Sequence, residues 1–453
     1  MPARPLTVIL LAALSLSAAM ASRAADDELI IVSPHWEGVR YEFGRAFEQF
    51  YHDQTGRTVS VRWRDLGGTS QIEKALNASF AATPDSAQVD ILFGGGLDPY
   101  LSQKARGHLL AHQLPADLRS QLPANVGGVP IIDRDHMFYG AALASFGILQ
   151  NNRVLALTMQ PRAETWEDLC RPELRGWVSS ADPRKSGAFH MIYEIILQAY
   201  GWERGWSVLY RMSGNVAAFL DNASGPAKEV ALGNAVCAPT IDSYGLTQRN
   251  FLGRDNLSLV IPRDLSVINP DGIAILKGAP NLRVAEMFVD FVLSPRGQSL
   301  WMRPRGAAGG PVKFDIARMG VLPALYAADG AGGARLLNPF AQNYSIPYRP
   351  ELGSGRWNLV NDLIGQTVID VHPQLRRCWQ AILSVPAAER GPFIEKFTAP
   401  FISEAAASAS AARWRQDPAA ARALAESWMK QAVQRYQNLE QEIHRYHKSY
   451  GTH

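Results

Sequence analysis

The first part of the chain alternates between apolar runs of strand length and stretches with helical spacing. Apolar residues fill or alternate through 29–33, 59–63 and 89–93, as in buried or half-buried strands. Between the first two runs, apolar residues recur every three or four positions, and a second helix is predicted from the turn at Gly67-Gly68 to Phe80. The resulting β-α-β-α-β series predicts a parallel sheet with right-handed crossovers.

A second α/β stretch begins after Phe138. It contains predicted strands at 177–179, 216–220, 235–240, 257–261 and 271–276, a helix that opens at Ser186-Gly187, and a helix pair at 284–293 and 295–302. From about Pro339 the pattern changes, and tryptophan, proline and arginine are scattered as far as Pro400. These changes indicate a further segment that is separate from the α/β part.

An apolar seam with helical spacing follows near the C-terminus. It consists of Met429, Val433, Tyr436, Leu439, Ile443 and Tyr446. Such a seam is short for an autonomous coiled coil. We therefore expect this helix to pack on its own protein, and a helix that binds a partner or a second copy is the alternative.

The first 24 residues have the pattern of a secretory signal peptide. Arg4 precedes an apolar segment at 6–19, and Ser22-Arg23-Ala24 has small residues where cleavage requires them. The segment is short for a membrane anchor, and acidic residues follow it at once. The pattern predicts an exported, soluble, periplasmic protein whose mature form begins at Ala25.

Composition narrows the classes of function. The chain has 453 residues, of which 47% are hydrophobic and 19% charged, and its net charge is +3. These are globular values, and so small a basic surplus argues against nucleic acid as a partner. Three cysteines make no disulfide framework, and a single Cys170–Cys237 bridge or three free thiols remain equally open. No G-x-S-x-G or H-E-x-x-H motif is present, so we expect no enzyme and no cofactor.

Three segments carry a resemblance to a known family. They are residues 181–187 (ADPRKSG), 241–248 (IDSYGLTQ) and 270–281 (PDGIAILKGAPN). Together they resemble the type 2 periplasmic solute-binding proteins of ABC importers, within the group that includes ferric-ion, phosphonate and phosphosugar receptors. The resemblance implies an α/β fold with two lobes, two crossing hinge strands and a cleft that closes over a ligand, here with a mostly helical C-terminal extension.

The resemblance also implies domain boundaries and partners. After the leader of residues 1–24, lobe 1 would hold residues 25–138 and 273–340, lobe 2 would hold 139–272, and the extension would hold 341–453. The crossings would fall near 139–142 and 268–271. The partners would be a small-molecule or ion ligand and an inner-membrane ABC permease, and the receptor would be a monomer.

Polar residues gather where predicted strands end and helices begin, which is where ligands bind in open α/β sheets. Free backbone N–H groups at helix starts suit an anion, and glycine allows close approach of the backbone. The candidate ligand-binding residues are Ser33, His35, Gly68, Thr69, Ser70, Gly95, Ser186, Gly187, Ser224, Asp242 and Tyr244. We predict that they bind a small organic or phosphorylated anion.

Two alternatives remain open. Ferric-ion receptors of the resembling family usually use two adjacent tyrosines, whereas this chain has Ser243-Tyr244. An iron site would therefore need Tyr244, His35 and Asp242, which is a small set of donors for a hard cation. The second alternative is a periplasmic ligand sensor that acts on a membrane signalling partner instead of an importer.

Overall fold

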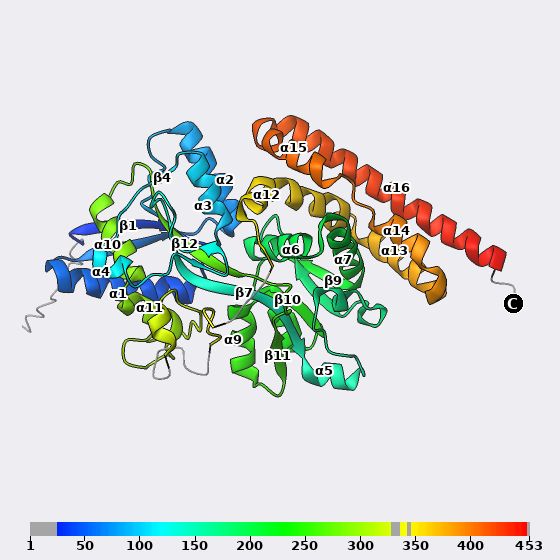
Figure 1. Cartoon of the computed structure of the whole chain (residues 1–453), viewed down its shortest axis with the longest axis horizontal. Helices are drawn as coiled ribbons and strands as arrows, with labels where there is room; N and C mark the ends of the chain where they lie inside the picture. Colours follow the sequence, from blue (N-terminus) through cyan, green and yellow to red (C-terminus); the bar gives the residue numbers. More distant parts are fainter. Residues whose placement is uncertain (1–24, 328–335, 342–345, 451–453) are drawn as a thin grey trace, which may run out of the picture.

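The computed structural model describes residues 25–327, 336–341 and 346–450, so the predicted leader lies outside the described residues. The chain forms a mixed α/β fold of two lobes, which two long strands connect, and a helical extension follows (Figure 1). The predicted fold class is confirmed. In the described residues, no helix is both long and apolar enough to cross a membrane.

The first lobe begins with the β-α-β-α-β series that the hydrophobic pattern predicts. β1 pairs in parallel with β2 on one side and with β3 on the other. The elements are β1 (Asp27–Val32), α1 (Glu37–Thr55), β2 (Val59–Arg64), α2 (Thr69–Ala82), β3 (Ile91–Phe93), α3 (Asp98–Ala105), β4 (Leu109–Leu110), α4 (Ala116–Arg119), β5 (Asn125–Val126) and β6 (Val129–Pro130).

Two strands run from one lobe into the other. They are β7 (Tyr139–Asn151) and β12 (Ile268–Leu276), which pair antiparallel. At one end β12 pairs with β3, and at the other end β7 pairs with β10 and β11, so the path through the sheet is β2-β1-β3-β12-β7-β10-β8-β9. Every residue of both strands is buried, as connections through the centre of a sheet require. The proposed lobe boundaries at 138 and 272 stay a prediction.

The second lobe packs helices on the other half of the sheet. Its elements are α5 (Asn152–Leu157), η1 (Trp166–Cys170), η2 (Pro172–Leu174), β8 (Val178–Ala181), α6 (Gly187–Tyr200), α7 (Trp202–Asn215), β9 (Val216–Leu220), α8 (Gly225–Leu232), β10 (Cys237–Ile241), α9 (Asp242–Leu252) and β11 (Leu257–Val260). After β12 the chain returns to the first lobe with α10 (Leu282–Leu293), α11 (Pro295–Met302) and η3 (Pro323–Tyr326), and α10 and α11 pack on α1.

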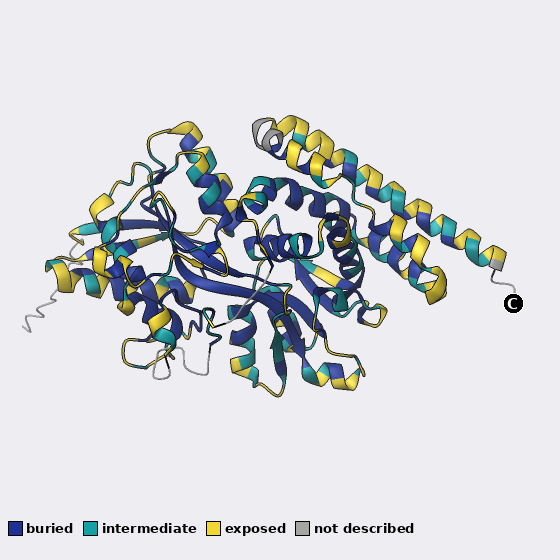
Figure 2. Ribbon diagram, in the orientation of Figure 1, coloured by how far each residue is buried: buried dark blue, intermediate teal, exposed yellow. Residues whose placement is uncertain are grey.

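The extension is helical from Pro350 onward. It consists of α12 (Pro350–Ile364), the π-helical turn η5 (Gly365–Ile369), α13 (His372–Ser384), η6 (Ala387–Glu389), α14 (Gly391–Thr398), α15 (Glu404–Gln416) and α16 (Pro418–Tyr450). The long helix α16 packs on α13 and η5 and buries Tyr436, Leu439 and Ile443, while its outer face is exposed (Figure 2). The expectation that this helix packs on its own protein is therefore confirmed.

The cysteines are three buried free thiols, so the Cys170–Cys237 bridge does not form. Cys170 lies in η1, where its Sγ contacts the backbone oxygen of Val208 at 3.3 Å, whereas Cys237 begins the central strand β10. Each thiol is packed into the core of the second lobe on its own element. Burial raises the pKa of both thiols to about 12, so both stay protonated at neutral pH.

Candidate functional site

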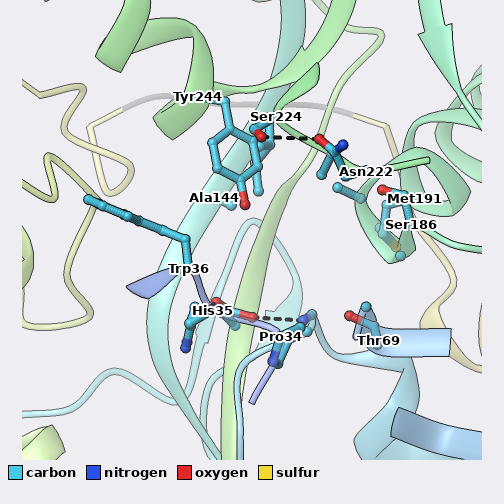
Figure 3. A pocket seen from close by; sticks show the side chains of 18 of the residues that line it. Pro34, His35, Trp36, Thr69, Ala144, Ser186, Met191, Asn222, Ser224 and Tyr244 are labelled. Carbon is cyan, nitrogen blue, oxygen red and sulfur yellow. Dashed lines mark hydrogen bonds and ion pairs between the residues drawn. The ribbon is translucent and has the colours of Figure 1, made fainter. Parts of the chain in front are cut away.

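A cavity of about 400 Å³ lies between the two lobes (Figure 3). Its wall is built from strand ends and helix starts of both lobes and from the crossing strands. The lining residues are Ser33, Pro34, His35, Trp36, Arg40, Asp65, Gly67, Gly68, Thr69, Gln71, Gly95, Gly96, Ala144, Phe146, Lys185, Ser186, Gly187, Ala188, Met191, Asp221, Asn222, Ala223, Ser224, Ile241, Tyr244, Asn269, Pro270, Asp271 and Arg318. This volume is within the range of small-molecule sites.

Most of the candidates from the sequence come together in this wall. They are Ser33, His35, Gly68, Thr69, Gly95, Ser186, Gly187, Ser224 and Tyr244. The structure places Ser70 and Asp242 outside it. The Ser70 hydroxyl faces Trp357, whose Nε1 donates to it at 3.2 Å, and the Asp242 carboxylate accepts from the backbone N–H and the hydroxyl of Ser145, both at 3.0 Å.

Two helix starts from different lobes meet at one side of the cavity. α2 begins at Thr69 after the extended residue Gly68, and α6 begins at Gly187 after its cap Ser186. A Cβ on Gly187 would lie 2.8 Å from Cβ of Thr69, so the two first turns are in contact. The first turn of a helix has N–H groups without intrahelical acceptors and the positive end of the helix dipole. Two such ends at one point favour a bound anion.

Ser186 already has a structural role at this point. Its hydroxyl accepts from the backbone N–H of Phe189 at 3.4 Å and so caps α6. A cap and a ligand contact are compatible, because a hydroxyl oxygen accepts one bond while its hydrogen donates another.

The glycine run after β3 allows the backbone to pass close to two candidate side chains. Gly94, Gly95 and Gly96 have φ angles of +96°, +102° and +83°, a region that residues with a Cβ rarely enter. A Cβ on Gly94 would lie 2.5 Å from the His35 ring, and one on Gly95 would lie 2.8 Å from the Thr69 hydroxyl. The run therefore fits the wall closely around these two groups.

A buried charged cluster forms the floor of the cavity. The Asp271 carboxylate accepts from Nη1 of Arg318 at 2.6 Å, from the His35 ring at 2.9 Å and from the backbone N–H of Gly96 at 2.7 Å. On the other side of the ring, Nδ1 of His35 lies 3.0 Å from the Ser33 hydroxyl. The cluster joins the end of β1, the crossing strand β12 and the segment after α11.

Electrostatics fix the protonation state of this cluster. Burial alone would raise the pKa of Asp271, but the Arg318 guanidinium and the hydrogen bond with His35 hold it well below its usual range. Burial lowers the pKa of His35, and its contact with Asp271 only partly offsets this effect. At neutral pH the cluster is therefore a carboxylate, a guanidinium and a neutral imidazole.

Two polar atoms in this floor have no partner among the described residues. They are Nε of Arg318 and Oδ1 of Asn269, both of which are buried. The other cations of the wall are paired, Arg40 with Asp65 at 3.1 Å and Lys185 with Asp221 at 2.7 Å. Since Arg318 is also paired, with Asp271, the features of the wall that favour an anion are the helix starts and the unpartnered Nε–H of Arg318, and not a surplus of charge.

Tyr244 points into the cavity from the start of α9 (Figure 3). Its hydroxyl has no hydrogen-bond partner in the described part of the chain, and burial raises the pKa of this phenol. A neutral phenol can donate one hydrogen bond to an anion. Phenolate ligation of a metal would first require the loss of that proton.

The three residues considered for iron do not converge. His35 is hydrogen-bonded at both ring nitrogens, Asp242 is turned to Ser145 outside the cavity wall, and Tyr244 enters the cavity from the start of α9. No group of three or more His, Cys, Asp or Glu side chains able to hold a metal occurs in residues 25–327, 336–341 and 346–450. The site thus differs from a preformed cation centre.

Sequence reasoning missed Asp271, Arg318 and Asn269 as cavity residues. Asp271 and Asn269 lie within a predicted crossing strand, so their place beside the cleft could have been inferred from the crossing itself. Arg318 follows α11 in a segment without regular periodicity, and it is 283 positions from His35 along the chain. No local pattern reveals a contact over such a separation.

Two lobes with a cavity between them are the architecture of the periplasmic binding proteins. The chain belongs to the bacterial extracellular solute-binding protein family, whose sequence model matches residues 86–314. It is 28% identical over 337 residues to the phosphoglycerate transport regulatory protein PgtC of Salmonella typhimurium. The aligned region covers 74% of this chain and 77% of PgtC.

Solved structures show the same fold. The periplasmic binding protein AfuA of Actinobacillus pleuropneumoniae, solved with fructose-6-phosphate, matches 77% of this chain and 100% of its own with a TM-score of 0.64 and 20% identity. Iron-bound HitA of Pseudomonas aeruginosa matches 75% of this chain and 99% of its own with a TM-score of 0.54 and 20% identity. At these identities the likeness establishes the fold and not the ligand.

Proposed function

We propose that this protein is a periplasmic receptor that captures a small phosphorylated or carboxylated organic anion and delivers it to an ABC importer. The observation that carries the proposal is the meeting of two helix starts, α2 from one lobe and α6 from the other, at the cavity wall. Closing the lobes brings both positive helix ends to one point. An anion bound there would stabilise the closed arrangement.

The polar atoms of the floor suit the rest of such a ligand. Arg318 can direct its unpartnered Nε–H to an oxyanion, and the Asn269 oxygen can accept a hydrogen bond from a ligand hydroxyl. The cavity also has apolar wall at Ala144, Phe146 and Met191, enough for a short carbon skeleton. The related PgtC is named a phosphoglycerate transport regulatory protein, and AfuA was solved with fructose-6-phosphate. Both names support this ligand class.

A sensing role is the second candidate. It is favoured by the description of PgtC as regulatory, since PgtC aligns with 74% of this chain. A receptor and a sensor would bind the ligand through the same cavity and differ only in the membrane partner. Cross-linking of the ligand-loaded protein in intact cells, followed by mass spectrometry, distinguishes a permease from a signalling protein.

Calorimetric titration tests the ligand class. We expect 3-phosphoglycerate or fructose-6-phosphate to bind with one site, and inorganic phosphate to bind more weakly because it lacks the hydroxyls and the carbon skeleton. Ser186→Ala should weaken binding by about tenfold to a hundredfold, the cost of one hydrogen bond to a charged group. Tyr51→Phe, which removes a hydrogen bond to Asp27 outside the cavity, serves as the control. Binding of ferric citrate alone would reject the proposal.

A further inference from the structure

Helix α12 of the extension lies between the two lobes, next to the cavity. It packs against α3 of the first lobe and against α6 of the second (Figure 1). Near it the lobes also touch each other, because the Ser70 hydroxyl on α2 lies 3.5 Å from the backbone oxygen of Pro183. Any hinge motion that separates α2 and α3 from α6 must therefore break the contacts of α12 with one lobe.

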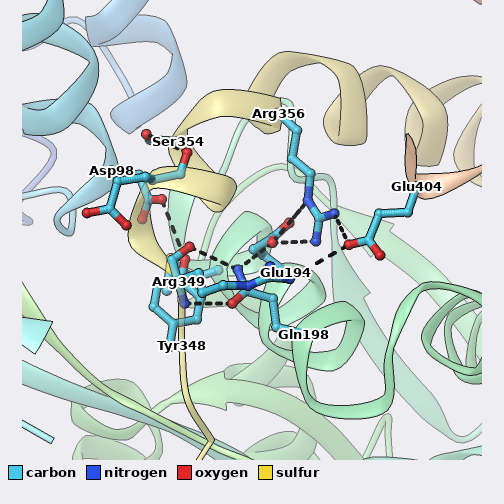
Figure 4. Close-up of polar contacts among 10 residues, drawn as sticks. Asp98, Glu194, Gln198, Tyr348, Arg349, Ser354, Arg356 and Glu404 are labelled. Carbon is cyan, nitrogen blue, oxygen red and sulfur yellow. Dashed lines mark hydrogen bonds and ion pairs between the residues drawn. The ribbon is translucent and has the colours of Figure 1, made fainter. Parts of the chain in front are cut away.

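The contacts of α12 with the second lobe are charged and buried. Arg356 on α12 and Glu194 on α6 are almost inaccessible to solvent, and their side chains form three contacts of 2.7–3.1 Å (Figure 4). Just before α12, the backbone N–H of Arg349 donates to Oε1 of Gln198 on α6, and Nε2 of Gln198 donates to the backbone oxygen of Arg349. Removing one partner of a buried ion pair would leave the other charge buried and uncompensated, so these contacts hold α12 to the second lobe.

The hydrogen bonds to the first lobe are longer and come from uncharged donors, although Asp362 on α12 also interacts with the charge of Lys74 on α2. Nε1 of Trp357 donates to the Ser70 hydroxyl at 3.2 Å, and the Tyr348 hydroxyl lies 3.5 Å from the Asp98 carboxyl. Trp357 also stacks on His190 of the second lobe, with ring centroids 3.6 Å apart. The indole is therefore anchored to the second lobe and reaches the first through one hydrogen bond.

From this asymmetry we propose that α12 is a clamp that holds the lobes closed in the absence of ligand. When the cleft opens, the extension stays with the second lobe. The bonds from Trp357 and Tyr348 to the first lobe, the packing of α12 on α3 and the contact between Ser70 and Pro183 then break. The inference rests on the proposed function in that the clamped cleft is the ligand site. The clamp sets the balance between the open and closed states, and hence how fast a ligand enters and how tightly it is held.

Two matched pairs of variants isolate the clamp. Trp357→Phe keeps a ring against His190 but removes the bond to Ser70. Its control is Trp379→Phe, which removes an indole bond from α13 of the extension to Asn215 of the second lobe and leaves the contacts with the first lobe intact. On α12 itself, a methyl group in Gly353→Ala would lie 2.6 Å from the Tyr348 hydroxyl and 2.8 Å from Asp98, whereas Gly355→Ala would meet nothing within 4 Å.

Distances between spin labels at Ala82→Cys and Lys228→Cys, one exposed site in each lobe, report the opening. The native cysteines are buried and do not compete for the label. Without ligand, we expect one dominant short distance in the parent protein. Trp357→Phe should raise the ratio of open to closed molecules about two- to tenfold, as expected for one hydrogen bond, and Gly353→Ala should also raise it, while both controls leave it unchanged.

The proposal fails if Trp357→Phe and Gly353→Ala leave the distances unchanged, or if the controls open the cleft equally. Because these measurements contain no ligand, they are independent of the titrations. If the cleft opens in the two variants but the protein binds no phosphorylated anion, the clamp proposal stands and the proposed ligand is rejected. The reverse pair of results would preserve the ligand and reject the clamp.

Discussion

Two buried carboxyl groups near the lobe interface have pKa values that are shifted in opposite directions. Asp271 is stabilised as a carboxylate by Arg318 and His35. Asp98 lies beside Glu194, and its Oδ2 has no partner among the described residues. Burial, with the negative charge of Glu194, raises the pKa of Asp98 well above its usual value. Surrounding charge, and not burial alone, decides the state of each group.

The raised pKa of Asp98 predicts that this residue lowers the stability of the folded protein as the pH rises. In the unfolded chain this carboxyl ionises near pH 4. Since its folded pKa is higher, its contribution to stability is full below that pH and is lost as the pH rises toward the folded pKa. Asp98→Asn, which stays neutral, should therefore raise the melting temperature at pH 7.5 and change it less at pH 4.5, as scanning calorimetry would measure.

Glu194, Glu73, Tyr348 and Arg356 also face this region, so the comparison needs a reference variant. Asp53→Asn, on the exposed surface of α1, should give a small change at both pH values. A melting temperature that falls in Asp98→Asn at pH 7.5 would show that Asp98 is charged and usefully paired, contrary to this account.

The Tyr244 hydroxyl distinguishes an anion ligand from ferric iron, because the two ligands require different protonation states of this group. If the neutral phenol donates to an anion, Tyr244→Phe should weaken binding by about tenfold to a hundredfold. If a phenolate ligates ferric iron, the same change should abolish binding, together with any visible charge-transfer colour of the iron-loaded protein. Titration and absorption spectra of both proteins separate these outcomes, and a coloured complex lost in the variant would contradict the anion proposal.

At this scale the sequence predicted the cavity residues that follow strands or begin helices, such as Ser33, Thr69 and Gly187. It could not predict those whose role depends on a distant partner. Arg318 lies in irregular chain and acts through Asp271, and Ser70 is turned from the cavity by Trp357, a residue of the extension. The local sequence pattern indicates helix caps and strand ends, but it does not indicate contacts between segments that are far apart in the chain.

At the scale of elements, hydrophobic periodicity was a reliable guide. The predicted strand at 216–220 is β9, and the predicted helix pair at 284–293 and 295–302 corresponds to α10 and α11. The segment before Pro400 was harder to interpret, because α12 carries the buried polar residues Arg356 and Asn361 among its apolar ones. Buried ion pairs interrupt the apolar stripe by which a helix is recognised.

The packing of α16 on the rest of the extension predicts a contribution to stability. Leu439 is buried on the inner face of this helix, whereas Gln437 is exposed. Leu439→Ala should lower the free energy of unfolding by about 2–5 kcal/mol, and Gln437→Ala should change it little. Chemical denaturation followed by circular dichroism measures both. Loss of a dimer without loss of stability in Leu439→Ala would instead indicate a helix that binds a second copy.

At the scale of the whole molecule, the two-lobe arrangement follows from the crossing strands β7 and β12. The family resemblance predicted where they lie, and their buried, strand-like sequences agree with it. The position of α12 between the lobes could not be predicted, since it depends on tertiary contacts such as those of Trp357. The extension therefore adds a helix, α12, that contacts both lobes, and the two-lobe fold alone does not imply such a helix.

The central claim is that the interlobe cavity holds a small organic anion between the starts of α2 and α6. Native mass spectrometry of the exported protein, purified without added ligand, tests it most directly. The account predicts a species heavier by the mass of one phosphorylated or carboxylated compound, which is released on denaturation and retained less by Ser186→Ala. A mass increase that matches iron, lost in Tyr244→Phe, would contradict it.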